Sequence, residues 1–227
     1  MWPTVVVGAA TVESLLHLRD VTDMQVVANS SGRARAVRVL AAGRWKTFKG
    51  QVIRKKFKLG STDFAVRVLT LDEAPARALY GTHVRIGGWL RGLGRARLQL
   101  LTQSGWTTVR HVHPSANGRF TVSLPATRTT QLRLAYNAVT GDEVTLRVTP
   151  RVSLQADGTK LHVLVAPRLP LQVQRLTKRR WTAVARSTGT FDRSLRPGSY
   201  RVAILGGSAY VSAISRPVVL HIAQIGP

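Results

Sequence analysis

From residue 77 onward, the chain consists of short segments in which apolar and polar residues alternate. Turns that contain Gly, Asn or Pro separate these segments about every eight to twelve residues. Alternation with a period of two is the pattern of a β-strand with one buried and one solvated face. Many short strands at this spacing are typical of β-sandwiches. The last two thirds of the chain are therefore predicted to be all-β.

This strand-rich part contains an internal repeat. Its matching segments are His83–Ile86 with Leu161–Leu164, Ala96–Leu100 with Leu171–Arg175, Gly105–Val109 with Arg180–Val184, Gly118–Phe120 with Gly189–Phe191, and Leu132–Leu134 with Tyr200–Val202. We therefore predict two related β-sandwich modules, 77–150 and 151–227, with a boundary near Pro150.

Each module has a Trp and a Phe at matching positions, namely Trp106 with Phe120 and Trp181 with Phe191. A large aromatic side chain between two sheets contributes much of a small domain's stability. We therefore expect all four rings in the cores. The alternative is that they form an exposed platform on which sugars stack.

Residues 1–76 differ in pattern. Val12, Leu15 and Leu16 have helical spacing, and so do the apolar residues within 51–59, which Gly50 and Gly60 bracket. Strands are expected at 24–28, 36–40 and 64–69, the first two joined by a turn at 29–32. This segment is predicted to be a small, partial α+β unit, so the fold class is mainly β.

The charge is strongly unbalanced, with 34 Lys and Arg against 10 Asp and Glu, a formal net charge of +24. Such a surface attracts polyanions: nucleic acid, phosphate-bearing wall polymers or anionic lipid. The densest cluster, Arg54, Lys55, Lys56 and Lys58, is the predicted polyanion-binding site. Sequence-specific nucleic-acid binding is disfavoured because no recognised binding module accompanies the charge.

Residues for catalysis or metal binding are sparse. Most acids fall in expected turns, such as Asp72-Glu73, Asp142-Glu143 and Asp157, and Glu13 is expected to complement a helix dipole. His111 and His113 share a strand face without a third ligand. The chain has no cysteine, and we find no nucleotide-binding or hydrolase motif. We therefore expect no catalytic residue, no metal and no cofactor.

The sequence also shows neither an apolar run long enough to span a membrane nor the pattern of a signal peptide at Met1.

An ordered set of short motifs links the first segment to a known family. The set comprises Pro3–Val7, Val12–Leu18, Val21–Val26, Ser31-Gly32-Arg33, Val37–Val39, Gly50 with Ile53-Arg54 and Phe57, and Leu59-Gly60-Ser61-Thr62-Asp63-Phe64. In this order it resembles the end of the stage II sporulation protein D/amidase-enhancer domain, whose members act on peptidoglycan.

This resemblance suggests Arg33, Arg54, Ser61 and Thr62 as substrate-binding residues. Structural roles are the simpler explanation for them, since Ser61 or Thr62 can satisfy backbone groups and Arg54 can bridge to neighbouring acceptors. The family's catalytic glutamate has no counterpart in this sequence.

The two modules in turn resemble the immunoglobulin-like accessory modules of secreted actinobacterial proteins. Together the resemblances imply a non-catalytic, cell-wall-associated scaffold region in the cell envelope or outside the cell. Its expected partners are anionic wall polymers or peptidoglycan and an upstream part of the same protein. The alternatives are a structural or adhesive surface protein and a non-specific polyanion or nucleic-acid binder.

Overall fold

The structure is a computed structural model that describes residues 4–221. These residues form two compact units. Of the described residues, the first unit comprises 4–75, 85–124 and 131–145, and the second comprises 76–84, 125–130 and 146–221. Within the described residues, no helix is long and apolar enough to cross a membrane.

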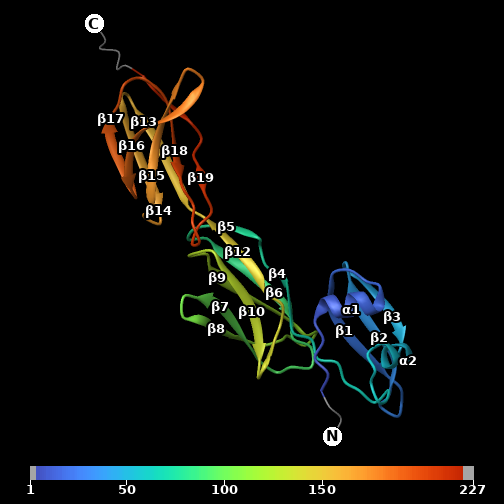
Figure 1. Cartoon of the computed structure of the whole chain (residues 1–227). Helices are drawn as coiled ribbons and strands as arrows, with labels where there is room; N and C mark the ends of the chain where they lie inside the picture. The colour runs from blue at the N-terminus through green and yellow to red at the C-terminus, as the bar shows by residue number, and fades with distance from the viewer. Residues whose placement is uncertain (1–3, 222–227) are drawn as a thin grey trace. The chain divides into compact units, whose positions relative to one another are not determined.

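The N-terminal part contains two short helices and a three-stranded antiparallel sheet (Figure 1, blue to teal). Their bounds are α1 Ala9–Leu16, β1 Val21–Ala28, β2 Ala34–Ala41, β3 Arg44–Lys49 and α2 Gly50–Lys56. Val12 and Leu16 of α1 and Ile53 of α2 form one core with the β2 residues Val37 and Val39. The helices therefore cover one face of the sheet, as an α+β unit requires.

Three predictions in this part were wrong. The strand β3 was missed, because Lys and Arg interrupt its apolar residues Trp45 and Phe48. The strand expected at 64–69 does not form, and a strand begins only at Thr70. The motif Pro3–Val7 of the family resemblance implies a further strand, but Pro3 lies outside the described residues and Thr4–Val7 are not in a strand.

The next strands form the two sheets of a sandwich, which we call the first sandwich (β4 to β12). Their bounds are β4 Thr70–Glu73, β5 Arg77–Leu79, β6 His83–Trp89, β7 Ala96–Thr102, β8 Gly105–Val112, β9 Arg119–Pro125, β10 Thr130–Tyr136, β11 Val139–Thr140 and β12 Val144–Thr149. One sheet has the order β4-β6-β9, and the other has the order β5-β12-β10-β7-β8 with β11 paired to β10.

The remaining strands form the second sandwich (β13 to β20). Their bounds are β13 Arg151–Asp157, β14 Lys160–Ala166, β15 Pro170–Thr177, β16 Arg180–Thr188, β17 Thr190–Ser194, β18 Gly198–Ile204, β19 Ala213–Ile214 and β20 Val218–Leu220. The order is β13-β14-β17-β16-β15-β18-β19, and β20 pairs with β18. The link between its two layers is the short β16–β17 corner at Thr188↔Thr190. The predicted mainly β fold with β-sandwich modules is confirmed.

The internal repeat extends to strand register. In the first sandwich, Leu98 and Gln99 of β7 flank a bulge toward β8, and they pair with Leu134 and Arg133 of β10. In the second sandwich, Val173 and Gln174 of β15 flank a bulge toward β16, and they pair with Val202 and Arg201 of β18. The two modules therefore place matching side chains on matching faces.

The sequence alignment of one repeat pair, His83–Ile86 with Leu161–Leu164, was shifted by one residue. In β6, Val84 and Ile86 are buried while His83 is exposed, whereas in β14 Leu161 and Val163 are buried. Val84 therefore corresponds to Leu161, where the sequence comparison had placed His83.

The prediction for the four aromatic side chains was half right. Phe120 and Phe191 are buried core residues. Trp106 and Trp181 were predicted to be buried in the core, but they are only half-buried. Each pairs with a leucine, Leu101 or Leu176, that lies on the outer face of its sheet. Arginine side chains, described below, cover the two indole rings instead.

Candidate anion-binding surfaces

The predicted basic cluster at α2 is only partly available for a ligand. The Arg54 Nε donates a hydrogen bond to Gln51 Oε1 at 3.0 Å. The Lys56 ammonium donates to the backbone carbonyl of Leu15. Among the described residues, Lys55 and Lys58 have no bonding partner for their side chains, and both are exposed. The structure thus leaves two of the four cations unengaged.

The four predicted substrate-binding residues mainly make local bonds. The backbone N–H of Arg33 donates to Asn29 Oδ1 at 3.0 Å, and the Ser61 hydroxyl accepts from the Asp63 N–H at 2.7 Å. The Thr62 carbonyl accepts from the Ala34 N–H at 2.8 Å, which brings Arg33 and Thr62 to neighbouring positions. In the described part of the chain, no hydrogen bond joins Arg54 to them. A substrate role for these residues stays a prediction.

A second basic cluster, which the sequence analysis did not single out, lies at the β15–β16 hairpin. Its two-residue loop is Lys178-Arg179, closed by the pair Thr177↔Arg180. Lys178, Arg179 and Arg180 are all exposed, and within residues 4–221 their side chains have no partner. Both loop residues are left-handed, with φ of 48° and 65°. Three consecutive cations were the available sequence signal, but only the structure shows that all three are free.

Two acids, Asp72 and Glu73, were wrongly predicted to be solvated turn residues. Asp72 and Glu73 lie in strand β4 and pair with Arg119, whose Nη1 is 3.3 Å from Asp72 Oδ2. Asp72 also accepts a 2.7 Å bond from the indole N–H of Trp89. Glu13 differs from its prediction too, since it accepts the Val21 N–H at 2.9 Å and lies within α1. These carboxylates hold strands and loops together.

Asp23 is the most buried acid, with a fully buried side chain. It accepts two hydrogen bonds from Arg91 Nε, at 2.9 and 3.1 Å, and one from Nη2 at 2.6 Å. A bidentate pair of this kind neutralises both charges in a buried setting. Among the described residues, no group of three or more His, Asp or Glu side chains could hold a metal ion.

On the outer face of the second sandwich, Arg201 of β18 is held from two sides. Its Nε donates to Gln174 Oε1 of β15 at 2.7 Å. Its guanidinium carbon lies 4.5 Å from the ring centroid of Trp181 in β16, within cation–π range. Its terminal nitrogens make no bond within residues 4–221. The arginine is therefore fixed in orientation while its two terminal NH2 groups remain open.

Arg133 on the outer face of the first sandwich is held in the same way. Its Nε donates to Gln99 Oε1 at 3.0 Å, and its guanidinium carbon lies 3.9 Å from the ring centroid of Trp106. Here a carboxylate is present, because Glu143 Oε1 lies 3.8 Å from Arg133 Nη1. The two sandwiches thus share a Gln–Arg–Trp arrangement, and within residues 4–221 only the arginine of the first has a carboxylate beside it.

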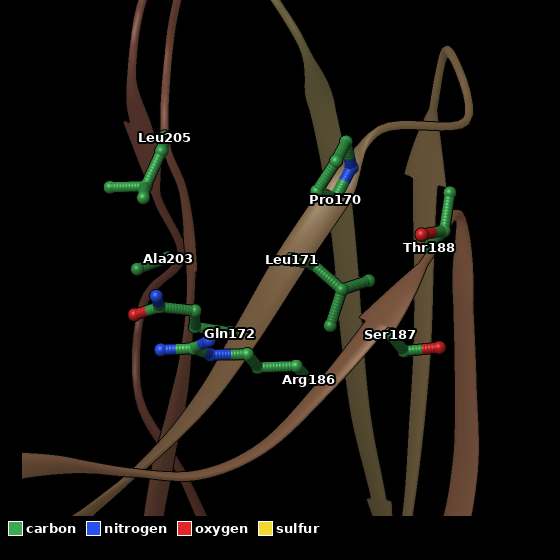
Figure 2. A pocket seen from close by; sticks show the side chains of 8 residues that line it. All are labelled: Pro170, Leu171, Gln172, Arg186, Ser187, Thr188, Ala203 and Leu205. Atoms are coloured by element: carbon green, nitrogen blue, oxygen red, sulfur yellow. The ribbon is translucent and has the colours of Figure 1, made fainter.

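A shallow depression of about 560 Å³ lies farther along the same three strands of the second sandwich. Figure 2 shows the Gln172 and Arg186 side chains together on one side of the strands, while Leu171 and Ser187 point to the other side. Gln172 pairs with both Arg186 and Ala203, and it lies two residues from Gln174 on β15. The depression and the Arg201 arrangement therefore share one sheet face.

The phenol of Tyr210, in the second unit, is a structural group. Its hydroxyl donates to the Thr127 carbonyl at 2.9 Å, and its ring meets Tyr80 edge to face with centroids 6.2 Å apart. Burial, and to a smaller extent Tyr80, raise its pKa above the usual 10.0, while Arg128 opposes the shift. Tyr210 therefore stays neutral at physiological pH and adds no anionic group.

The sequence matches no known protein-family model and no curated protein. The comparison with solved structures finds, among others, a chimeric titin Z1Z2-Z1Z2 tandem that carries a GRGDS peptide from fibronectin. It has 11% identity and a TM-score of 0.28, with 69% of this chain and 100% of that chain covered. A second is the titin A168169 structure, with 11% identity and a TM-score of 0.30, covering 70% of this chain and 98% of that chain.

Proposed function

We propose that this chain is a non-catalytic scaffold and adhesion region that binds anionic polymers of a cell wall through its cations. The observation that carries the proposal is the set of exposed cations that have no partner within residues 4–221, above all Lys178, Arg179 and Arg180. Because acids such as Asp23, Asp72 and Glu73 pair with internal arginines, the excess charge remains for an external polyanion.

The resemblance of the first segment to the sporulation protein D/amidase-enhancer domain supports a wall polymer as the partner. In this proposal an upstream part of the same protein acts on peptidoglycan, or stimulates an amidase, at the cell envelope. The present chain supplies spacing and attachment there. A purely adhesive surface protein with sandwich modules is the second candidate, and the basic sheet faces fit it equally well.

A pull-down on purified walls, with and without their anionic polymers, tests the proposal over a salt series. We expect binding to intact walls that weakens steeply with salt, because exposed charges farther apart than about 8 Å are largely screened at physiological ionic strength. Salt-resistant binding to walls stripped of anionic polymers would show that a specific glycan site is responsible instead.

The two basic clusters provide a matched comparison. Changing Lys178, Arg179 and Arg180 to Gln should lower wall affinity more than changing Arg54, Lys55 and Lys56, although both triple variants lose the same charge. The hairpin cations are all free, whereas Arg54 and Lys56 bond within the protein. An equal loss in both variants would show that only net charge matters.

A further inference from the structure

The Gln–Arg–Trp arrangement of the second sandwich has the features of a built oxyanion site. The planar guanidinium of an arginine presents parallel N–H groups that match the two oxygens of a phosphate or carboxylate. Such an anion binds most strongly when the guanidinium is already oriented, because little side-chain entropy is then lost on binding. Gln174 and Trp181 provide that orientation for Arg201 through a hydrogen bond and a stacking contact.

In the first sandwich, a carboxylate lies beside the matching arginine. The carboxylate of Glu143 lies next to Arg133, whose side chain is 20% exposed. Because the two arginines occupy the same register and have the same two supports, Glu143 indicates the chemical class of ligand for Arg201.

The second sandwich has no equivalent acid. The sequence contains no Asp or Glu after Asp192, and Asp192 pairs with Lys160 and His162. The position that Glu143 fills in the first sandwich is therefore open to an external anion at Arg201.

We propose that Arg201, oriented by Gln174 and Trp181, binds an oxyanion group, and that this group is a phosphodiester of the wall polymer. The assignment to a polymer rests on the proposed function. It is favoured because Arg186 lines the depression on the same face, about 7 Å farther along the strands and, since β15 lies between β16 and β18, about 10 Å across the sheet. A linear polymer with successive phosphates can contact both arginines.

Calorimetric titration of the full chain with a poly(glycerol phosphate) oligomer tests this site, with neutral dextran as the uncharged control. Arg201→Gln should lower the affinity about tenfold, the usual effect of losing a hydrogen-bonded charge. Arg201→Lys should lose nearly as much, because lysine keeps the charge but lacks the fork. Arg151 on β13 is exposed and has no side-chain partner among the described residues. Arg151→Gln therefore removes the same charge and should change the affinity less than twofold.

Equal effects of Arg201→Gln and Arg151→Gln would overturn the site while leaving the electrostatic function intact. If the unmodified chain did not bind the oligomer even at low salt, the proposed function would fail instead. The site is then judged with inorganic phosphate, which should shift the NMR signal of the Trp181 indole N–H in the unmodified chain but not in Arg201→Gln. An unshifted signal would overturn the oxyanion site as well.

The first sandwich offers a gain-of-function test. Glu143→Gln removes the internal carboxylate, so Arg133 should become a second phosphate site and the indole signal of Trp106 should respond to phosphate. Asp142→Asn is the matched control, since it removes an adjacent exposed acid that does not pair with Arg133. If phosphate shifted the Trp106 signal equally in both variants, the orientation of the Arg133 guanidinium would not explain phosphate binding.

Discussion

The tryptophan and the phenylalanine of the second sandwich contribute to stability in different ways. Phe191 is a buried core residue, so Phe191→Ala should cost about 3–5 kcal/mol of unfolding free energy. Trp181 lies outside that core beneath Arg201, so Trp181→Ala should cost less, mainly the cation–π contact of about 0.5–2 kcal/mol and some apolar burial. Chemical denaturation of the two variants measures the difference. A larger loss of unfolding free energy for Trp181→Ala than for Phe191→Ala would show that the Trp181 ring belongs to the core.

The β15–β16 hairpin places charge where geometry favours other residues. Two-residue hairpin loops with both φ values positive prefer Asn-Gly, but here the loop is Lys178-Arg179. Changing it to Asn-Gly should stabilise the protein by about 1–2 kcal/mol, because left-handed backbone is costly for most L-residues. The same change should weaken wall binding. Thermal unfolding and the wall pull-down measure the two effects. If the variant lost stability as well as affinity, the native loop would not be strained, and the weaker binding could be due to a poorer fold.

For the whole molecule, the net charge of +24 predicts binding to polyanions of several kinds. Duplex DNA should bind, and the logarithm of its binding constant should fall linearly with the logarithm of the salt concentration. Binding should show no sequence preference, because phosphate contacts supply affinity and base contacts supply specificity. Fluorescence anisotropy with two duplexes of equal length and different sequence checks this. A marked preference for one duplex would show sequence-specific binding and would favour nucleic acid over the wall polymer as the partner.

Local sequence patterns determined most of the architecture. The alternation of apolar and polar residues has a period of two on any strand with one buried face, so the sandwich strands and the repeat could be recognised from the sequence. The helices α1 and α2 followed from apolar residues at helical spacing. The strand β3 could not be found in this way, because basic residues outnumber its apolar ones and its partner β2 decides its pairing.

The sequence by itself also determined the excess of positive charge and its wide distribution. Only the tertiary structure decided which charges are free, because pairing joins residues far apart in the chain, as with Asp23 and Arg91. It likewise placed Trp181 on an outer face, since alternation alone does not say which side of a strand meets the core. For the same reason, the free terminal nitrogens of Arg201 and the carboxylate beside Arg133 became visible only when three neighbouring strands were brought together.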